Sequence, residues 1–154
     1  TINVPAVAGF GKAVEIATRD IIVNQQKIKT IRDYFVKQIT EKIPYIRVNG
    51  HPYQKVQGIV NIGFEMVDAE ALLTMLDLEG IAVSIGSACT AGVAEQSHVL
   101  KAMHVPEEYL KGSIRFSFGK NVSKEDIDYT IEKLCEIVAK LRSISSVTKT
   151  GRAK

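Results

Sequence analysis

Residues 59–83 read IVNIGFEMVDAEALLTMLDLEGIAV, and this stretch decides the fold class. Its first six residues, Ile59–Phe64, are mostly β-branched or apolar and predict a strand. Asp68 then predicts the cap of a leucine-rich helix, which Gly80 ends. Ile81–Val83 predicts a second short strand. Because strand and helix alternate here and along the rest of the chain, we expect an α/β or α+β layered domain.

The chain from Val4 to about Lys42 predicts one long helix. Asn3 is a suitable cap, Pro5 fits the first turn, and Pro44 ends the run. Such a helix is roughly 55 Å long at 1.5 Å per residue, which is long for a small domain. It could be a coiled-coil or bundle helix, or a connector whose N-terminal end packs on another domain. Its apolar positions recur at steps of three, four and seven residues: Val7, Phe10, Val14, Ala17, Ile21, Ile28, Ile31, Phe35 and Ile39.

The C-terminal part predicts a half-buried strand and a final helix. In Ser113–Phe118 apolar and polar residues alternate, so Arg115 lies on the face opposite the apolar side chains. Ser123 and Asp126 form a variant capping box at the start of the last helix. From Ser143 onward the chain is polar, which predicts a disordered tail. Further expected elements are a strand at 45–48 and short helices at 97–103 and 106–110.

The composition is that of an ordinary globular domain. The chain has 154 residues, 45% of them hydrophobic and 24% charged. Its net charge of +3 is not arranged as a basic stripe with aromatic residues, so we expect no nucleic acid partner. No signal peptide and no apolar stretch of membrane-spanning length occurs, so we expect no membrane. The chain begins at Thr1 rather than at a methionine, which suggests a fragment, a processed chain or an isolated domain.

Cys89 is the first candidate for chemistry. It lies in residues 84–92, SIGSACTAG, where small side chains flank the sulfur and two glycines permit hinge motion. A thiolate here could be a nucleophile or a sulfur carrier. The context alone also allows a small-residue turn with an incidental cysteine. Cys135 lies beside the apolar face of the last helix and is interpreted as core filler. Two cysteines make no disulfide framework, and reduced thiols fit a cytoplasmic protein.

Arg115 is the second candidate. Between Ser113 and Ser117, its guanidinium could bind a carboxylate through two hydrogen bonds. The alternative is a charge at the sheet edge in water, and the spacing leaves both open. The three histidines lack metal-ligand spacing, so we expect no metal site, although His98 could help to position the Cys89 loop.

Three segments resemble one family closely: residues 84–92, residues 95–100 (EQSHVL) and residues 112–119 (GSIRFSFG). They are similar to the C-terminal part of NifS/IscS-type (group I) cysteine desulfurases, and residues 1–17 resemble the start of that family's interdomain helix. The resemblance implies the small C-terminal domain of a class V aminotransferase-like, pyridoxal-phosphate-dependent transferase fold with a long N-terminal connector helix. Residues 1–20 would then border a large cofactor domain, 21–143 would form the small domain, and 144–154 a tail.

The resemblance also implies roles for three residues. The family converts L-cysteine to L-alanine and leaves the sulfur as a persulfide on the enzyme. Cys89 would be the thiolate that takes the sulfur, and Arg115 would bind the substrate carboxylate. Thr1 would contact the phosphate of pyridoxal phosphate in the partner subunit of a homodimer. The sulfur would pass to acceptor proteins such as an iron–sulfur scaffold.

One departure limits what this chain can do alone. The family's Schiff-base lysine stands in a Ser-x-His-Lys motif, whereas the histidines here precede Pro52, Val99 and Val105. We therefore expect the chain alone to bind no pyridoxal phosphate and to lack desulfurase activity. The alternatives are a non-catalytic sulfur-carrier or partner-docking module that keeps Cys89, and a structural domain in which Cys89 is inert.

Overall fold

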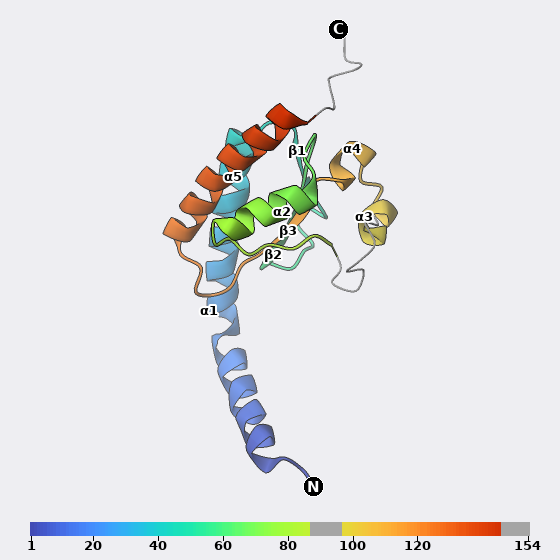
Figure 1. The fold of residues 1–154 in the computed structure, drawn as a ribbon. Helices are drawn as coiled ribbons and strands as arrows, with labels where there is room; N and C mark the ends of the chain where they lie inside the picture. Colours follow the sequence, from blue (N-terminus) through green and yellow to red (C-terminus); the bar gives the residue numbers. More distant parts are fainter. Residues whose placement is uncertain (87–96, 146–154) are drawn as a thin grey trace.

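A small antiparallel sheet with helices on both faces forms the part of the chain that the structure describes. The structure is a computed structural model, and it describes residues 1–86 and 97–145. The alternation of strands and helices confirms the α/β prediction (Figure 1). In chain order the elements are α1 (Val4–Lys42), β1 (Ile46–Asn49), β2 (Ile59–Phe64), α2 (Ala69–Leu78), α3 (His98–Ala102), α4 (Glu107–Leu110), β3 (Ser113–Ser117) and α5 (Lys124–Ile144).

The sheet has the order β1-β2-β3, and both strand pairs are antiparallel. Alternate residues of each strand face the core, where the C-terminal part of α1, together with α2 and α5, covers one face of the sheet. The opposite face carries α4, because the Cβ side of Gly63 points at Tyr109. The fully buried side chains of the core are Phe35, Ile39, Ile62, Phe64, Leu72, Leu76, Ile114, Ile131, Leu134 and Val138.

Helix α1 matches its predicted bounds, but only its C-terminal part packs on the sheet. Asn3 Oδ1 accepts a hydrogen bond from Ala6 N at 3.1 Å, and the helix ends at Lys42, before Pro44. The first buried residue of α1 is Arg32, so the N-terminal half projects from the domain (Figure 1). Its exposed apolar side chains include Val4, Val7, Phe10, Val14, Ile21, Ile22 and Val23. No helix in residues 1–86 and 97–145 is both long and apolar enough to span a bilayer.

The ends of α2 and α5 follow the sequence prediction. Asp68 Oδ1 accepts from Ala71 N at 3.0 Å at the start of α2. At its end Gly80 has a φ of 75°, and the next amide returns to the carbonyl of Leu76, which is a Schellman motif. At the start of α5 both hydrogen bonds of the capping box between Ser123 and Asp126 are formed. These interactions are local, and local sequence is therefore enough to predict them.

Two strand predictions need correction. The first strand begins at Ile46 rather than Tyr45, because Tyr45 has a φ of 56°, which no strand residue adopts. Its carbonyl accepts hydrogen bonds from Glu65 N and from Arg142 Nη2, both at 3.1 Å, so distant residues hold this turn. Residues 81–83 form no strand. Their apolar side chains pack against the core instead of pairing, and only the next residue, Ser84, makes a bridge, to Arg115.

Two carboxyl groups near the start of α5 make the free energy of unfolding depend on pH. The amide of Ser123 lowers the pKa of Asp126 below its ordinary value of 3.8, and the hydrogen bonds from Lys124 and Tyr34 lower the pKa of Asp128. A carboxyl with a lowered folded pKa stabilises the fold above its unfolded pKa and loses that contribution as the pH falls. We expect the free energy of unfolding to decrease as the pH drops below about 4.

Urea unfolding at several pH values and constant ionic strength measures this effect. The double variant Asp126→Asn, Asp128→Asn keeps the side-chain oxygens that accept the hydrogen bonds but has no carboxyl to titrate at these positions. Its stability should fall less steeply below pH 4 than that of the parent protein. Equal slopes for the two proteins would show that these carboxyls are not responsible.

Candidate functional site

Arg115 lies on the face of β3 opposite the helices of the core. Its neighbours Ile114 and Phe116 are buried in the core, whereas Arg115 itself is exposed. Ser84 flanks it: Arg115 N donates to Ser84 O at 2.7 Å, and Ser84 N donates to Arg115 O at 3.1 Å. The guanidinium also donates from Nη2 to Ser84 Oγ at 3.3 Å. No carboxylate within the described ranges forms an ion pair with Arg115.

The described residues that flank the Cys89 segment lie close together, and one flank leads directly to the partner of Arg115. Cys89 itself lies outside the described residues. The chain leaves Ser84 and reaches Gly86, whose φ is 64° and whose Cβ position would lie 3.8 Å from Ser97 Cβ. Ser97 in turn caps α3, because its Oγ accepts from Leu100 N at 3.4 Å. Gly86 and Ser97, the described residues on either side of 87–96, thus lie close together, and Gly86 is two residues from the serine that pairs with Arg115.

The other residues singled out in the sequence lie elsewhere. Thr1 is exposed at the outer end of α1, far from β3 (Figure 1), so the chain does not bring it to Arg115. His98 is exposed in the first turn of α3, next to one end of the 87–96 segment. Cys135 is half-buried against the core, and this burial raises the pKa of its thiol, which confirms its interpretation as core filler. No cluster of three or more potential metal ligands occurs in the described part of the chain.

Sequence reasoning missed two asparagines on the same sheet face. Asn61 of β2 is the direct cross-strand partner of Arg115, and Asn49 of β1 is the partner of Asn61. Asn49 Nδ2 donates to Asn61 Oδ1 at 2.7 Å. A signal was present for Asn61, which interrupts the apolar strand β2, whereas Asn49 is the last residue of β1; only the strand register places both in line with Arg115.

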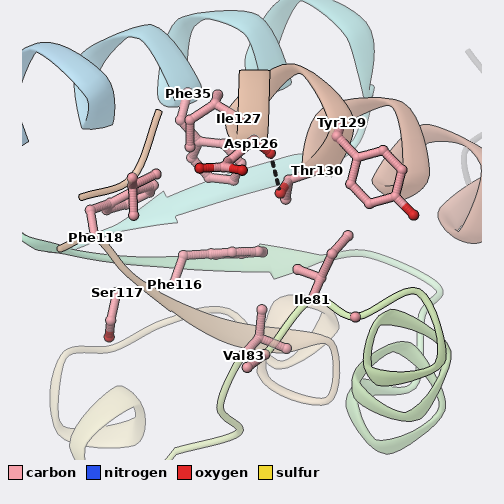
Figure 2. A pocket seen from close by; sticks show the side chains of 13 residues that line it. Phe35, Ile81, Val83, Phe116, Ser117, Phe118, Asp126, Ile127, Tyr129 and Thr130 are labelled. Atoms are coloured by element: carbon pink, nitrogen blue, oxygen red, sulfur yellow. Dashed lines mark hydrogen bonds between the residues drawn. The ribbon is translucent and has the colours of Figure 1, made fainter. Parts of the chain in front are cut away.

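A hollow on the helical side of β3 is not part of this site. It has a volume of about 300 Å³ and lies between residues 81–83, the end of β3 and the first turns of α5 (Figure 2). Phe35, Phe116 and Phe118 are among the residues that line it. At its edge Thr130 Oγ1 donates to the carbonyl of Asp126 at 2.7 Å. The hollow lies on the helical face of the sheet, whereas Arg115 lies on the opposite face, so the two are separate.

Comparison with known proteins agrees with this geometry. The Aminotransferase class-V family matches residues 1–130. The chain belongs to this family. Within the family it is 43% identical over 148 residues to cysteine desulfurase IscS of Methanosarcina thermophila, covering 96% of this chain and 36% of that protein. It is 41% identical over 145 residues to cysteine desulfurase IscS of Dictyoglomus turgidum, covering 94% of this chain and 37% of that protein.

Solved structures give the same family. The NifS-like protein of Rickettsia africae superimposes with a TM-score of 0.77 at 34% identity, covering 90% of this chain and 36% of that one. This match confirms the expected class V aminotransferase fold. The chain spans about a third of the length of the curated relatives that it matches.

The class-V aminotransferase family implies pyridoxal phosphate in the full-length enzyme. The residues described here do not form a site for it on their own. A lysine that binds an aldehyde cofactor is held in an enclosed site, where burial makes its amine nucleophilic. No lysine in residues 1–86 and 97–145 is buried. The cofactor would therefore need residues from the part of the family's length that this chain does not span.

Proposed function

We propose that the chain is the C-terminal part of a cysteine desulfurase and that Cys89 takes up the sulfur of L-cysteine. The observation that carries this proposal is the pairing of Arg115 with Ser84 at the base of the Cys89 segment. A group that binds a carboxylate and a segment that bears a thiol then belong to one site. The names of the relatives, cysteine desulfurase IscS, support the same reaction.

Arg115 is proposed to bind the substrate carboxylate. A guanidinium offers parallel N–H donors that match the two oxygens of a carboxylate. Two backbone hydrogen bonds to Ser84 and the pairing with Asn61 hold the arginine from both sides of its strand. The substrate would thus be oriented by a rigid sheet, while the thiol arrives on a connecting segment.

The proposed chemistry at Cys89 balances without an external oxidant. The Cys89 thiolate attacks the sulfur of the bound cysteine, and an S–S bond forms as the C–S bond breaks. The electron pair of the C–S bond goes to the substrate carbon, which also takes up a proton. The products are alanine and a persulfide on Cys89. An acceptor thiol or scaffold then removes the outer sulfur.

The remaining assignments complete this proposal. Residues 1–20 would border the large domain of the full-length enzyme, residues 21–143 would form its small domain, and residues 144–154 would be a tail. The expectation of a disordered tail from Ser143 onward needs correction, because helix α5 continues to Ile144; residues 146–154 lie outside the described ranges. Thr1 would contact the cofactor phosphate of the partner subunit in a homodimer. An iron–sulfur scaffold would be an acceptor, in line with the IscS name of the relatives, and the cytoplasm would be the compartment.

A second candidate is a sulfur carrier without its own catalysis. It is favoured by one observation, the lack of any buried lysine in the described ranges. The coding sequence separates the two candidates. A Ser-x-His-Lys segment upstream in the same reading frame supports the desulfurase, and a stop codon or a native start near Thr1 supports the carrier.

Replacing Cys89 tests the proposed reaction. In the whole enzyme, loaded with pyridoxal phosphate, Cys89→Ser should lower alanine formation from L-cysteine at least about a hundredfold, because a serine hydroxyl is not ionised at neutral pH. Mass spectrometry should find one added sulfur atom on the Cys89 peptide of the parent enzyme after a single turnover.

The matched control is Cys135→Ser, which removes the other thiol from a half-buried position in the packed helix α5. This variant should keep alanine formation close to that of the parent. Full activity of Cys89→Ser, or a persulfide on Cys135 alone, would refute the assignment. The 154-residue chain by itself should form no alanine from cysteine and pyridoxal phosphate.

A further inference from the structure

A line of four polar residues crosses the sheet face opposite the helical core. Asn49 is paired with Asn61, Asn61 with Arg115, and Arg115 with Ser84. Directly paired residues of neighbouring strands point to the same face. Their neighbours along the strands, such as Val60 and the other core residues, point to the opposite face. These four residues therefore form one polar row, with Arg115 as its only charge.

One hydrogen bond orients the Asn61 carboxamide in the structure. Its Oδ1 accepts from Asn49 Nδ2 at 2.7 Å, on the side of β1. The nitrogen of the same carboxamide is then turned away from β1, and β3 lies on the other side of β2. Within the described ranges Asn61 Nδ2 makes no hydrogen bond. A free N–H donor thus lies on the same side of β2 as the guanidinium of Arg115.

Asn49 has a feature that its packing does not explain. Its Oδ1 is buried and accepts no hydrogen bond among the described residues. A buried acceptor without a partner lowers the stability of the fold, and an apolar residue at this position would avoid that loss. What Asn49 provides, and an apolar residue could not, is the hydrogen bond that it donates to Asn61. A buried polar group of this kind is a reason to look for a function.

We infer that Asn61 is a second donor to the carboxylate that Arg115 binds, and that Asn49 is the residue that positions it. The inference rests on the proposed role of Arg115. The bound carboxylate would receive hydrogen bonds from the guanidinium and from Asn61 Nδ2, and the Ser84 hydroxyl would steady the arginine. A neutral donor beside an arginine adds direction without adding charge. The site would thus select an α-carboxylate over an uncharged group of the same shape.

The test uses NMR titration of the 154-residue chain with sodium acetate, the smallest suitable carboxylate. The signals followed are the Nε–H of Arg115 and the side-chain amide of Asn61. Sodium chloride at matched ionic strength and neutral acetamide are the controls. We expect saturable shifts of both signals with acetate only. Asn61→Ala should raise the acetate dissociation constant about tenfold, which is the effect of one charge-assisted hydrogen bond.

The outcomes separate this inference from the proposed function. If acetate shifts the Arg115 signal while Asn61→Ala leaves the affinity unchanged, Asn61 is no donor, and the role of Arg115 stands. If acetate shifts neither signal, both the inference and the carboxylate role of Arg115 are refuted. Neither outcome depends on Cys89 or on the cofactor, so the sulfur chemistry is tested independently.

Asn49→Leu separates positioning from a purely structural role. Leucine has a similar size and removes the buried Oδ1, so the free energy of unfolding should stay equal or rise. It also removes the hydrogen bond that orients Asn61, and acetate binding should therefore weaken by a factor similar to that of Asn61→Ala. A loss of stability with unchanged acetate affinity would overturn the positioning role of Asn49.

Discussion

Gly112→Ala is expected to remove most of the stability of the domain. A Cβ at this position would overlap the carbonyl oxygen of Phe64 and lie 2.8 Å from that of Val67. Both obstacles are backbone atoms, so no side-chain rotation can relieve them. The end of β2 and the start of the chain toward α2 would have to move. We expect a loss of about 4 kcal/mol or more in the free energy of unfolding, measured by urea denaturation followed by circular dichroism.

The backbone segments that lie close together at Gly112 are also joined by hydrogen bonds, and moving these segments apart would break them. Phe64 N donates to Gly112 O at 3.0 Å, and Ala69 N donates to Lys111 O at 3.0 Å. The matched control is Gly119→Ala, because no heavy atom lies within 4 Å of the Cβ position there. That variant should change the stability by no more than about 0.5 kcal/mol. Equally small losses of stability in both variants would show that the backbone around Gly112 can move at little energetic cost.

Much of the fold follows from local sequence. The caps at Asn3, Asp68 and Ser123 form as predicted, because each cap bonds to a backbone amide three residues away. The exact bounds of α1 and β2 follow from the same kind of short-range information. The period of the apolar residues then fixes which face of each element is buried.

What the sequence did not predict depends on distant contacts. Tyr45 and Met66 have positive φ values, and Arg142 of α5 donates to the carbonyls of Tyr45 and Glu65 beside them. No local sequence pattern predicts such an arrangement. The apolar run at 81–83 is similar in this respect, because periodicity cannot tell whether apolar residues pair as a strand or only pack.

The candidate site also contains residues that the sequence predicts and residues that only the fold brings together. Arg115 was predicted because a charge that interrupts an apolar alternation is visible in the sequence. Its partners Ser84 and Asn61 were not, since they come from segments that only the strand register places beside β3. Cys89 is a prediction from its small neighbours and lies outside the described residues. The structure adds that the flanking Gly86 and Ser97 lie close together, and that Gly86 is two residues from the Ser84 that pairs with Arg115.

Phe35→Ala is expected to have the second largest effect, because this ring joins α1 to the sheet. Phe35 is completely buried, and its ring centroid lies 4.9 Å from that of Phe116 and 5.3 Å from that of Phe118. Truncation of a buried phenylalanine costs about 3–5 kcal/mol. We expect the upper part of that range, since the new cavity would join the hollow that Phe35 already lines (Figure 2). Urea denaturation followed by circular dichroism measures the loss.

The same helix supplies the control. Phe10→Ala makes the identical substitution in α1 at a side chain that is 72% exposed, and it should change the stability by no more than about 0.5 kcal/mol. Helix propensity acts similarly at both positions, so the difference between the two variants isolates packing on the sheet. Because α1 buries few other residues, loss of the Phe35 ring should weaken the attachment of the entire helix. Equal losses in the two variants would mean that α1 is stabilised along its whole length rather than by this contact.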